Sequence, residues 1–306
     1  MRRLLVAVLV AGAAAGVAGW VLTAPRTLPA AEVAAAGPGD AARGERIFWA
    51  GGCASCHARP QAQGDARLEL AGGVALETPF GTFVAPNISP HPTDGIGGWS
   101  VEDLANAMVE GVSPEGEHYY PAFPYASYAR MELGDIADLH AFMQTLPPVE
   151  GRAPDHSLAF PYNVRRGIGL WKVLHLSREP VLDLANANEQ VKAGQYLVEG
   201  PSHCGECHTP RDLSGGIVKS DWLAGAVAAE GDGRVPNITP QGSDVGNWSE
   251  SDIAEYLKSG FTPEFDSAGG AMADVVKNTS MLSDEDRAAI AAYLKAVPPR
   301  PNGYGG

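Results

Sequence analysis

The strongest hydrophobic pattern in the chain is a continuous apolar run at the N-terminus. Residues 4–22 are uncharged, and Arg2 and Arg3 stand directly before them. A positive flank followed by an apolar run is typical of an export signal or a membrane anchor. The run approaches the roughly 20 residues that span a bilayer and exceeds the apolar core of about 7–15 residues in a cleaved signal, so its length favours an uncleaved anchor. The positive-inside rule then predicts a cytoplasmic N-terminus, with the chain from about Thr23 onward outside.

Helical periodicity follows in matching pairs of segments. The segments 135–148 and 286–299 have apolar residues at helical spacing, and both stop at a Pro-Pro pair that cannot continue a helix. A shorter helix is expected well before each of them, at 42–52 and at 192–201. Packing the first helix of each copy against the last would close a small domain.

A middle helix is expected in each copy, and it belongs to an internal repeat. The segments 86–104 and 236–253 read PNISPHPTDGIGGWSVEDL and PNITPQGSDVGNWSESDI. In them Ser100 and Ser249 are good N-caps with acidic residues in the first turn. A repeat at about 150 residues predicts two tandem domains, and the helices make both of them all-α. The expected boundaries are an N-terminal anchor or signal at 1–30, a first domain at 37–150, a connector at 151–185 and a second domain at 186–306.

Composition adds two constraints. The chain has 306 residues, enough for two domains, and its 37 Gly and 24 Pro predict long loops that need another source of cohesion. Its net charge of −14 argues against a nucleic-acid partner, because phosphate binding depends on clustered Lys and Arg. An acidic surface suits a basic protein partner instead.

The four cysteines fall into two CxxCH motifs, CASCH at 53–57 and CGECH at 204–208. CxxCH is the attachment motif of haem c. Its two thiols form thioether bonds to the haem vinyl groups, which places the adjoining imidazole, here His57 or His208, under the iron as proximal ligand. We therefore expect two covalently bound haem c groups, attached through Cys53, Cys56, Cys204 and Cys207.

Other uses of the cysteines fit less well. A zinc site would need the two pairs closer in sequence than about 150 residues. A thioredoxin-like CxxC would need a βαβ pattern around it, which the sequence lacks. A disulfide within one motif would close a very small loop, where the entropic gain is least.

The chain resembles the cytochrome c subunits of periplasmic membrane-bound bacterial dehydrogenases, of the alcohol, aldehyde and gluconate type. The resemblance runs from about Gly44 to Pro299, and its most specific pieces are YYPAFPYASYARM, GQYLVEGPSHCGECHTPRDL and GGAMADVVKNTS. The alcohol and gluconate dehydrogenase subunits typically carry three haems, whereas this chain has two motifs. The resemblance therefore implies a dihaem relative with cytochrome c folds.

A low-spin electron carrier needs a second axial ligand, and Met thioethers are the main candidates. Met108 and Met143 lie in helical apolar patterns, where Met ordinarily fills a core. Met131 instead ends an irregular stretch before the last helix of the first copy, and the resemblance points to the same residue. We expect Met131 to bind the first iron.

The second copy offers two candidates, Met272 and Met281. The repeat places Met131 opposite Leu282, one residue beyond Met281, and so does not decide between them. The resemblance favours Met272 as ligand of the second iron, and the glycines before it let backbone approach a haem edge.

The resemblance also implies a proline carbonyl that accepts a hydrogen bond from each proximal imidazole. Pro210 matches this position in the second copy, and Pro60 is one residue farther on in the first. The connector is too apolar for a free linker and is expected to pack between the domains. Its Arg165 and Arg166 could face haem propionates or could be solvated.

These features predict an electron carrier that is not itself an enzyme. A periplasmic dehydrogenase catalytic subunit would be the donor, and an oxidase, soluble cytochrome or quinone the acceptor. The chain would lie on the periplasmic side of the bacterial inner membrane, anchored by its N-terminal span or exported by a cleaved signal. The alternative is a dihaem cytochrome c peroxidase, which needs an open or displaceable sixth position and acid-base groups near one iron. A haem sensor is the third possibility, but nothing in the sequence resembles an output module.

Overall fold

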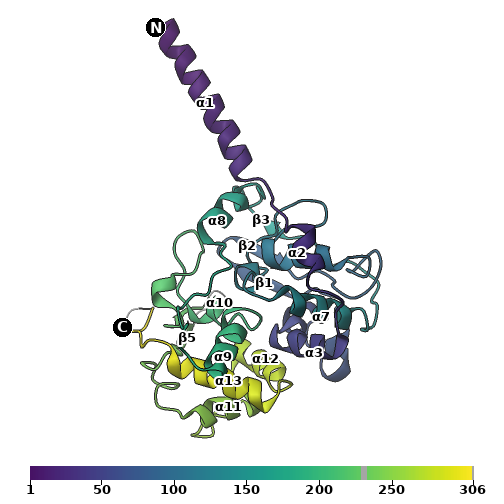
Figure 1. Cartoon of the computed structure of the whole chain (residues 1–306), viewed down its shortest axis with the longest axis vertical. Coiled ribbons are helices and arrows are strands. Elements are labelled where there is room, and N and C mark those ends of the chain that lie inside the picture. The colour runs from purple at the N-terminus through teal and green to yellow at the C-terminus, as the bar shows by residue number, and fades with distance from the viewer. Residues whose placement is uncertain (229–232, 305–306) are drawn as a thin grey trace.

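The computed structural model describes residues 1–228 and 233–304 and consists of two helical halves with one long helix projecting from them (Figure 1). The projecting helix is α1 (Arg2–Leu22). The first half contains α2 (Ala30–Ala34), α3 (Ala41–Ala50), α4 (Cys53–His57), η1 (Gly64–Leu68), β1 (Ala75–Thr78), β2 (Gly81–Val84), α5 (Val101–Ala105), η2 (Asn106–Glu110), α6 (Tyr125–Tyr128) and α7 (Leu133–Met143). The connector contributes β3 (Ser157–Leu158) and α8 (Gly167–His175). The second half contains α9 (Glu189–Glu199), α10 (Gly205–His208), η3 (Lys219–Asp221), β4 (Ala226–Val227), β5 (Arg234–Val235), α11 (Glu250–Ser259), α12 (Gly270–Thr279) and α13 (Asp284–Ala296).

Each half is closed by a crossing of its first and last long helices, α3 with α7 and α9 with α13. The crossings are tight because a glycine stands at each contact. A Cβ atom on Gly44 would lie 1.9 Å from the carbonyl oxygen of Asp138, and one on Gly194 would lie 1.9 Å from that of Ala289. The predicted packing of first helix against last is confirmed in both halves.

The middle helices begin where their caps predict. Ser100 accepts a hydrogen bond from the backbone N–H of Asp103, whose carboxylate in turn accepts from the N–H of Ser100. Ser249 and Asp252 form the same capping box at the start of α11. Each box satisfies two backbone donors that the first helical turn leaves unpaired, so these helices begin at fixed residues.

Short strands make the fold mostly helical rather than strictly all-α, which corrects the fold prediction. β1 and β2 form an antiparallel hairpin in which Thr78 pairs with Gly81, and β3 from the connector adds a third strand. β4 and β5 pair in the second half. Strands of two to four residues carry too little alternation to be read from sequence.

The connector contacts both halves, as expected from its apolar composition. On α8, Lys172 Nζ donates to the carbonyl oxygen of Glu110 at 2.6 Å in the first half. Trp171 Nε1 donates to the carbonyl oxygen of Ser214 at 3.1 Å in the second. The connector thus joins the halves into one body, with α8 at the base of α1 (Figure 1).

Within the described part of the chain, α1 is the one helix long and apolar enough to cross a membrane. Its segment Arg3–Leu22 has a mean hydropathy of 2.3, and none of it is buried against the body. A signal sequence near an N-terminus can also form a helix of this length and composition.

Candidate haem centres

Both CxxCH motifs form a single helical turn, α4 and α10, that ends at the histidine. His57 Nδ1 lies 2.8 Å from the carbonyl oxygen of Pro86, and His208 Nδ1 lies 2.8 Å from that of Pro236. A carbonyl oxygen can only accept, so Nδ1 carries the proton in each ring and Nε2 keeps the lone pair. Burial lowers the pKa of both histidines, which favours the neutral imidazole that binds iron.

These carbonyls correct the prediction that Pro60 and Pro210 accept the hydrogen bonds of the proximal imidazoles. Pro60 and Pro210 stand close to the histidines in sequence, whereas the chain returns to each imidazole only after a long loop, at Pro86 and Pro236. The acceptors are the first residues of the repeated PNI[S/T]P segment. Its duplication was the signal that could have identified them.

The residue after each acceptor proline holds that carbonyl in place. Asn87, which is buried, donates to the carbonyl oxygens of Val149 and Gly151 and accepts from the N–H of Ser89. Asn237 is buried in the same way and donates to the carbonyl oxygen of Arg300. Each loop is therefore fixed by a side chain that reaches past the closing helix.

The thiols fit covalent attachment better than metal–thiolate binding. Burial, helped by the neighbouring thiol, raises the pKa of Cys53 and of Cys204 to about 12. Among the described residues no three His, Cys, Asp or Glu side chains are grouped to hold a metal. The sets Cys53, Cys56, His57 and Cys204, Cys207, His208 thus fit one haem c each.

The methionine candidates differ in their surroundings. Met131 follows α6 and is only 3% exposed. Met272 lies in α12, half-buried and packed against the core, whereas Met281 is 54% exposed. Met272 thus has the protein packing that a positioned ligand needs. The assignment of Met131 and Met272 as sixth ligands stays a prediction.

Each motif is contacted by the other half of the molecule. Asn278 of α12 donates to the hydroxyl of Ser55 at 2.7 Å, inside the first motif. Ser127 of α6 donates to the carboxylate of Glu206 at 2.7 Å, inside the second. Ser55 and Glu206 are each the third residue of their CxxCH motif. Each half therefore contacts the same position in the motif of the other half.

A second exchanged pair supports this arrangement. Arg46 of α3 binds Asp286 of α13 at 2.7 Å, and the hydroxyl of Tyr196 on α9 donates to Asp135 of α7. Ser127 and Asn278 lie at equal distances before these two aspartates. The two halves are therefore related by an approximate twofold axis, and both motifs lie toward the interface between the halves.

The two connector arginines are engaged away from the motifs. Arg165 donates to the carbonyl oxygen of His118 and lies over the ring of Tyr120. Arg166 lies over the ring of Trp20 at the end of α1. The suggestion that they face haem propionates is not supported by these contacts.

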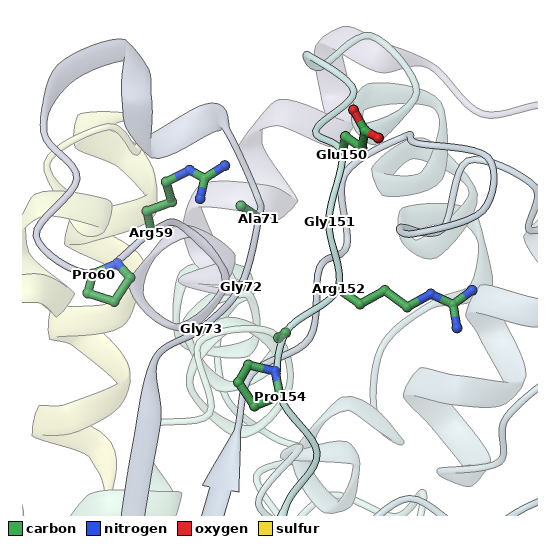
Figure 2. Close-up of a pocket in the computed structure, with 10 residues that line it drawn as sticks. Arg59, Pro60, Ala71, Gly72, Gly73, Glu150, Gly151, Arg152 and Pro154 are labelled. Atoms are coloured by element: carbon green, nitrogen blue, oxygen red, sulfur yellow. The ribbon is translucent and has the colours of Figure 1, made fainter.

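A cavity of about 470 Å³ lies beside the loop that follows His57. Figure 2 shows Arg59 and Pro60 on one side of it and the segment 150–154 on the other. Its lining residues lie in loops and include none of the attachment residues. One of them, Gly72, donates its backbone N–H to the carbonyl oxygen of His57, so the cavity lies next to the first motif.

Comparison with known proteins agrees with this geometry. The cytochrome c family matches residues 41–147 and again residues 191–298. A "Diheme cytochrome c-type" protein of Cereibacter sphaeroides is 58% identical over 299 residues, which cover 97% of this chain and 99% of the relative.

Two further relatives belong to dehydrogenases. The fructose dehydrogenase cytochrome subunit of Gluconobacter japonicus is 38% identical over 84% of this chain, and the cytochrome c subunit of the quinone-dependent alcohol dehydrogenase of Gluconobacter oxydans is 35% identical over 93%. The matches span 52% and 61% of the length of those two subunits.

Proposed function

The chain belongs to the cytochrome c family, and on that premise we propose that it is a dihaem electron carrier that takes electrons from a periplasmic dehydrogenase and passes them to the respiratory chain. The observation that carries the proposal is the interface between the halves, at which each half contacts the CxxCH motif of the other. Two equivalent CxxCH motifs, each with its imidazole held by a proline carbonyl, are bound to each other's domain through Ser55 and Asn278 and through Glu206 and Ser127.

The residues of the chain have distinct tasks in this function. The thiols hold each haem covalently, and the carbonyls of Pro86 and Pro236 hold the proximal imidazoles in one orientation and one tautomer. Met131 and Met272 are proposed to close the sixth positions. When bound, each haem iron supplies a one-electron ferric/ferrous couple. A rigid six-coordinate site reorganises little on changing charge, which suits electron transfer.

The interface makes transfer within the chain the expected route. Since the contacts of Asn278 and Ser127 fix each motif against the opposite half, the haem-to-haem separation does not depend on free motion of the domains. One haem would accept the electron from the partner and the other would deliver it.

The proposed donor is the catalytic subunit of a dehydrogenase, because two of the relatives are named as cytochrome subunits of such enzymes. The proposed acceptor is an oxidase, a soluble cytochrome or a quinone. We place the chain on the periplasmic side of the inner membrane with α1 as its anchor, in line with the apolar, unburied surface of that helix.

The peroxidase alternative gains no support. The relatives are named as a dihaem cytochrome and as dehydrogenase cytochrome subunits, and each half offers a methionine for the sixth position.

The test is to purify the full chain from its native membranes in mild detergent, identify what co-purifies by mass spectrometry and follow haem reduction by candidate substrates. We expect a stoichiometric dehydrogenase whose substrate reduces both haems. A solitary chain that turns over hydrogen peroxide would contradict the proposal.

A further inference from the structure

Helix α8 has its polarity reversed relative to a helix on a water-facing surface. Its apolar residues Leu170, Val173 and Leu174 recur at helical spacing and are exposed. The polar Lys172 is buried on the opposite face, toward the body. A surface helix ordinarily turns its apolar stripe toward the protein core. An apolar stripe that faces outward therefore indicates a surface that another partner covers.

The exposed stripe continues into the loop before α8. Phe160 is 80% exposed, and Tyr162 and Val164 are exposed as well. We call the set of six side chains the connector surface: Phe160, Tyr162, Val164, Leu170, Val173 and Leu174. Scattered single apolar residues are normal on a protein surface, but six within one short segment mark an interaction site.

The connector surface is tied to the end of α1. The guanidinium of Arg166 lies 4.0 Å from the centre of the Trp20 ring, binds the carbonyl oxygen of Trp20 and donates to the hydroxyl of Thr23 at 3.1 Å. Gly169 lies so close to Thr23 that a Cβ there would be 2.3 Å from its carbonyl oxygen. Figure 1 shows α8 at the end of the body from which α1 projects.

The charge of the segment identifies its partner. Residues 156–178 contain no Asp or Glu, although the chain as a whole has a net charge of −14. The cations of the segment that reach its surface are Arg165, Arg166 and Arg178, of which Arg165 pairs with Glu117 and Arg178 with Glu32, whereas Lys172 is buried against the first half. Exposed aromatic and aliphatic side chains beside cations are the composition of segments that lie in the headgroup region of an anionic bilayer.

We propose that the connector surface lies in the headgroup region on the periplasmic side of the inner membrane, beside α1. The body would then have two attachments to the lipid instead of one. With a single helix in the membrane, the orientation of the body toward the bilayer would depend on the tilt of that helix alone. With the connector embedded as well, both haem halves are held at a fixed orientation toward partners in or on the membrane. The inference rests on the proposed role of α1 as an uncleaved anchor.

The test uses the full haem-loaded chain in vesicles of phosphatidylcholine and phosphatidylglycerol. Leu174→Cys and, separately, Phe160→Cys place one new thiol on the connector surface, while the four native cysteines are occupied by haem. Phe265→Cys is the matched control, since Phe265 is an exposed aromatic residue (88%) of the second half. We expect a charged, water-soluble maleimide to label Leu174→Cys and Phe160→Cys about tenfold or more slowly than Phe265→Cys, because lipid headgroups cover the first two sites.

The outcomes separate this inference from the function on which it rests. Equal labelling of all three thiols in a chain that still floats with the vesicles would overturn the connector contact and leave the anchor intact. A chain that does not float with vesicles would overturn both. Protection that vanishes on dilution of the chain into more lipid would assign the surface to a second copy. Protection seen in native membranes but not in vesicles would assign it to a protein partner, and either result rejects the lipid contact.

Discussion

The two halves hold their imidazoles alike, but they differ in charge beside the motif. In the first half Ser55 precedes Cys56 and receives a hydrogen bond from the neutral amide of Asn278. In the second half the same position is Glu206, a mostly buried carboxylate bound by Ser127 and, at 2.6 Å, by Arg211. The duplication has thus kept the geometry of the ligand and changed the charge beside it. We therefore predict that the two haems differ in potential.

The helix crossings differ as well. Under the crossing of α3 and α7, Asp138 receives hydrogen bonds from Arg43 and from the N–H of Asp40. Ala289 is the residue that meets Gly194 in the second half. Both helix crossings therefore depend on a close contact between a glycine and the backbone of the opposite helix. The ion pair of Arg43 with Asp138 belongs to the first crossing, since alanine stands at the matching position of the second.

The largest expected effect is loss of one haem. Replacing Cys53 and Cys56 with Ala should leave one haem per chain, held by the second half, and replacing Cys204 and Cys207 should leave the other. The measurement is the pyridine haemochrome spectrum per mole of protein together with the intact mass. If either pair removed both haems, the halves would not be independent attachment sites.

Breaking either crossing should be the next largest effect. Gly44→Ala and Gly194→Ala each force a Cβ against a backbone carbonyl, and we expect a loss of about 3 kcal/mol or more in the free energy of unfolding. Urea unfolding followed by circular dichroism measures it. The matched control is Gly134→Ala in α7, where a Cβ meets nothing within 4 Å, so the change should be neutral or stabilising. Similar losses at all three glycines would contradict the role of the crossings.

Asp138→Asn should remove about 1–2 kcal/mol from the free energy of unfolding. The side-chain hydrogen bond from Arg43 holds the pKa of Asp138 below its ordinary value of 3.8. The unfolded chain therefore binds this proton first as the pH falls, and the stabilisation is present above about 3.8 and lost as pH drops through the lower, folded pKa. Urea unfolding at a series of pH values should show a shallower acid dependence for the variant. The exposed Glu69→Gln is the control, and an unchanged acid profile in Asp138→Asn would refute the assignment.

The smallest effect sharpens the electrostatic difference. Glu206→Gln removes a negative charge beside the second motif. Loss of this charge favours the ferrous state of the second haem, so the reduction potential of that haem alone should rise. We expect a shift of about 60 mV or less, the amount that corresponds to a tenfold change in a one-electron equilibrium. Spectroelectrochemical titration resolves the two haems, with Ser55→Ala as the partner variant that leaves the charge unchanged. A shift of the first haem instead would show that Glu206 does not act locally.

Local signals in the sequence predicted much of this molecule. The long helices followed from apolar spacing and the Pro-Pro stops, the caps from Ser100 and Ser249, and the attachment sites from CxxCH. These features depend on residues a few positions apart, where sequence patterns are informative.

Contacts made by backbone atoms or across long stretches of chain were not predictable in the same way. The carbonyl of Pro86 carries no side-chain signature, and only the repeat of the segment around it marks its position. Ser55 and Asn278 lie 223 residues apart in the sequence and in different halves. Their contact could be predicted only if the relative position of the two halves were known. The place of Arg166 against α1 likewise depends on how the connector folds back.

The most direct test of the central claim is an anaerobic spectroelectrochemical titration of the full haem-loaded chain, with the spin state followed in the same sample. The account predicts two one-electron transitions at different potentials, two low-spin haems per chain in both redox states, and no turnover of hydrogen peroxide. A single haem per chain, or a high-spin iron that consumes peroxide, would contradict it.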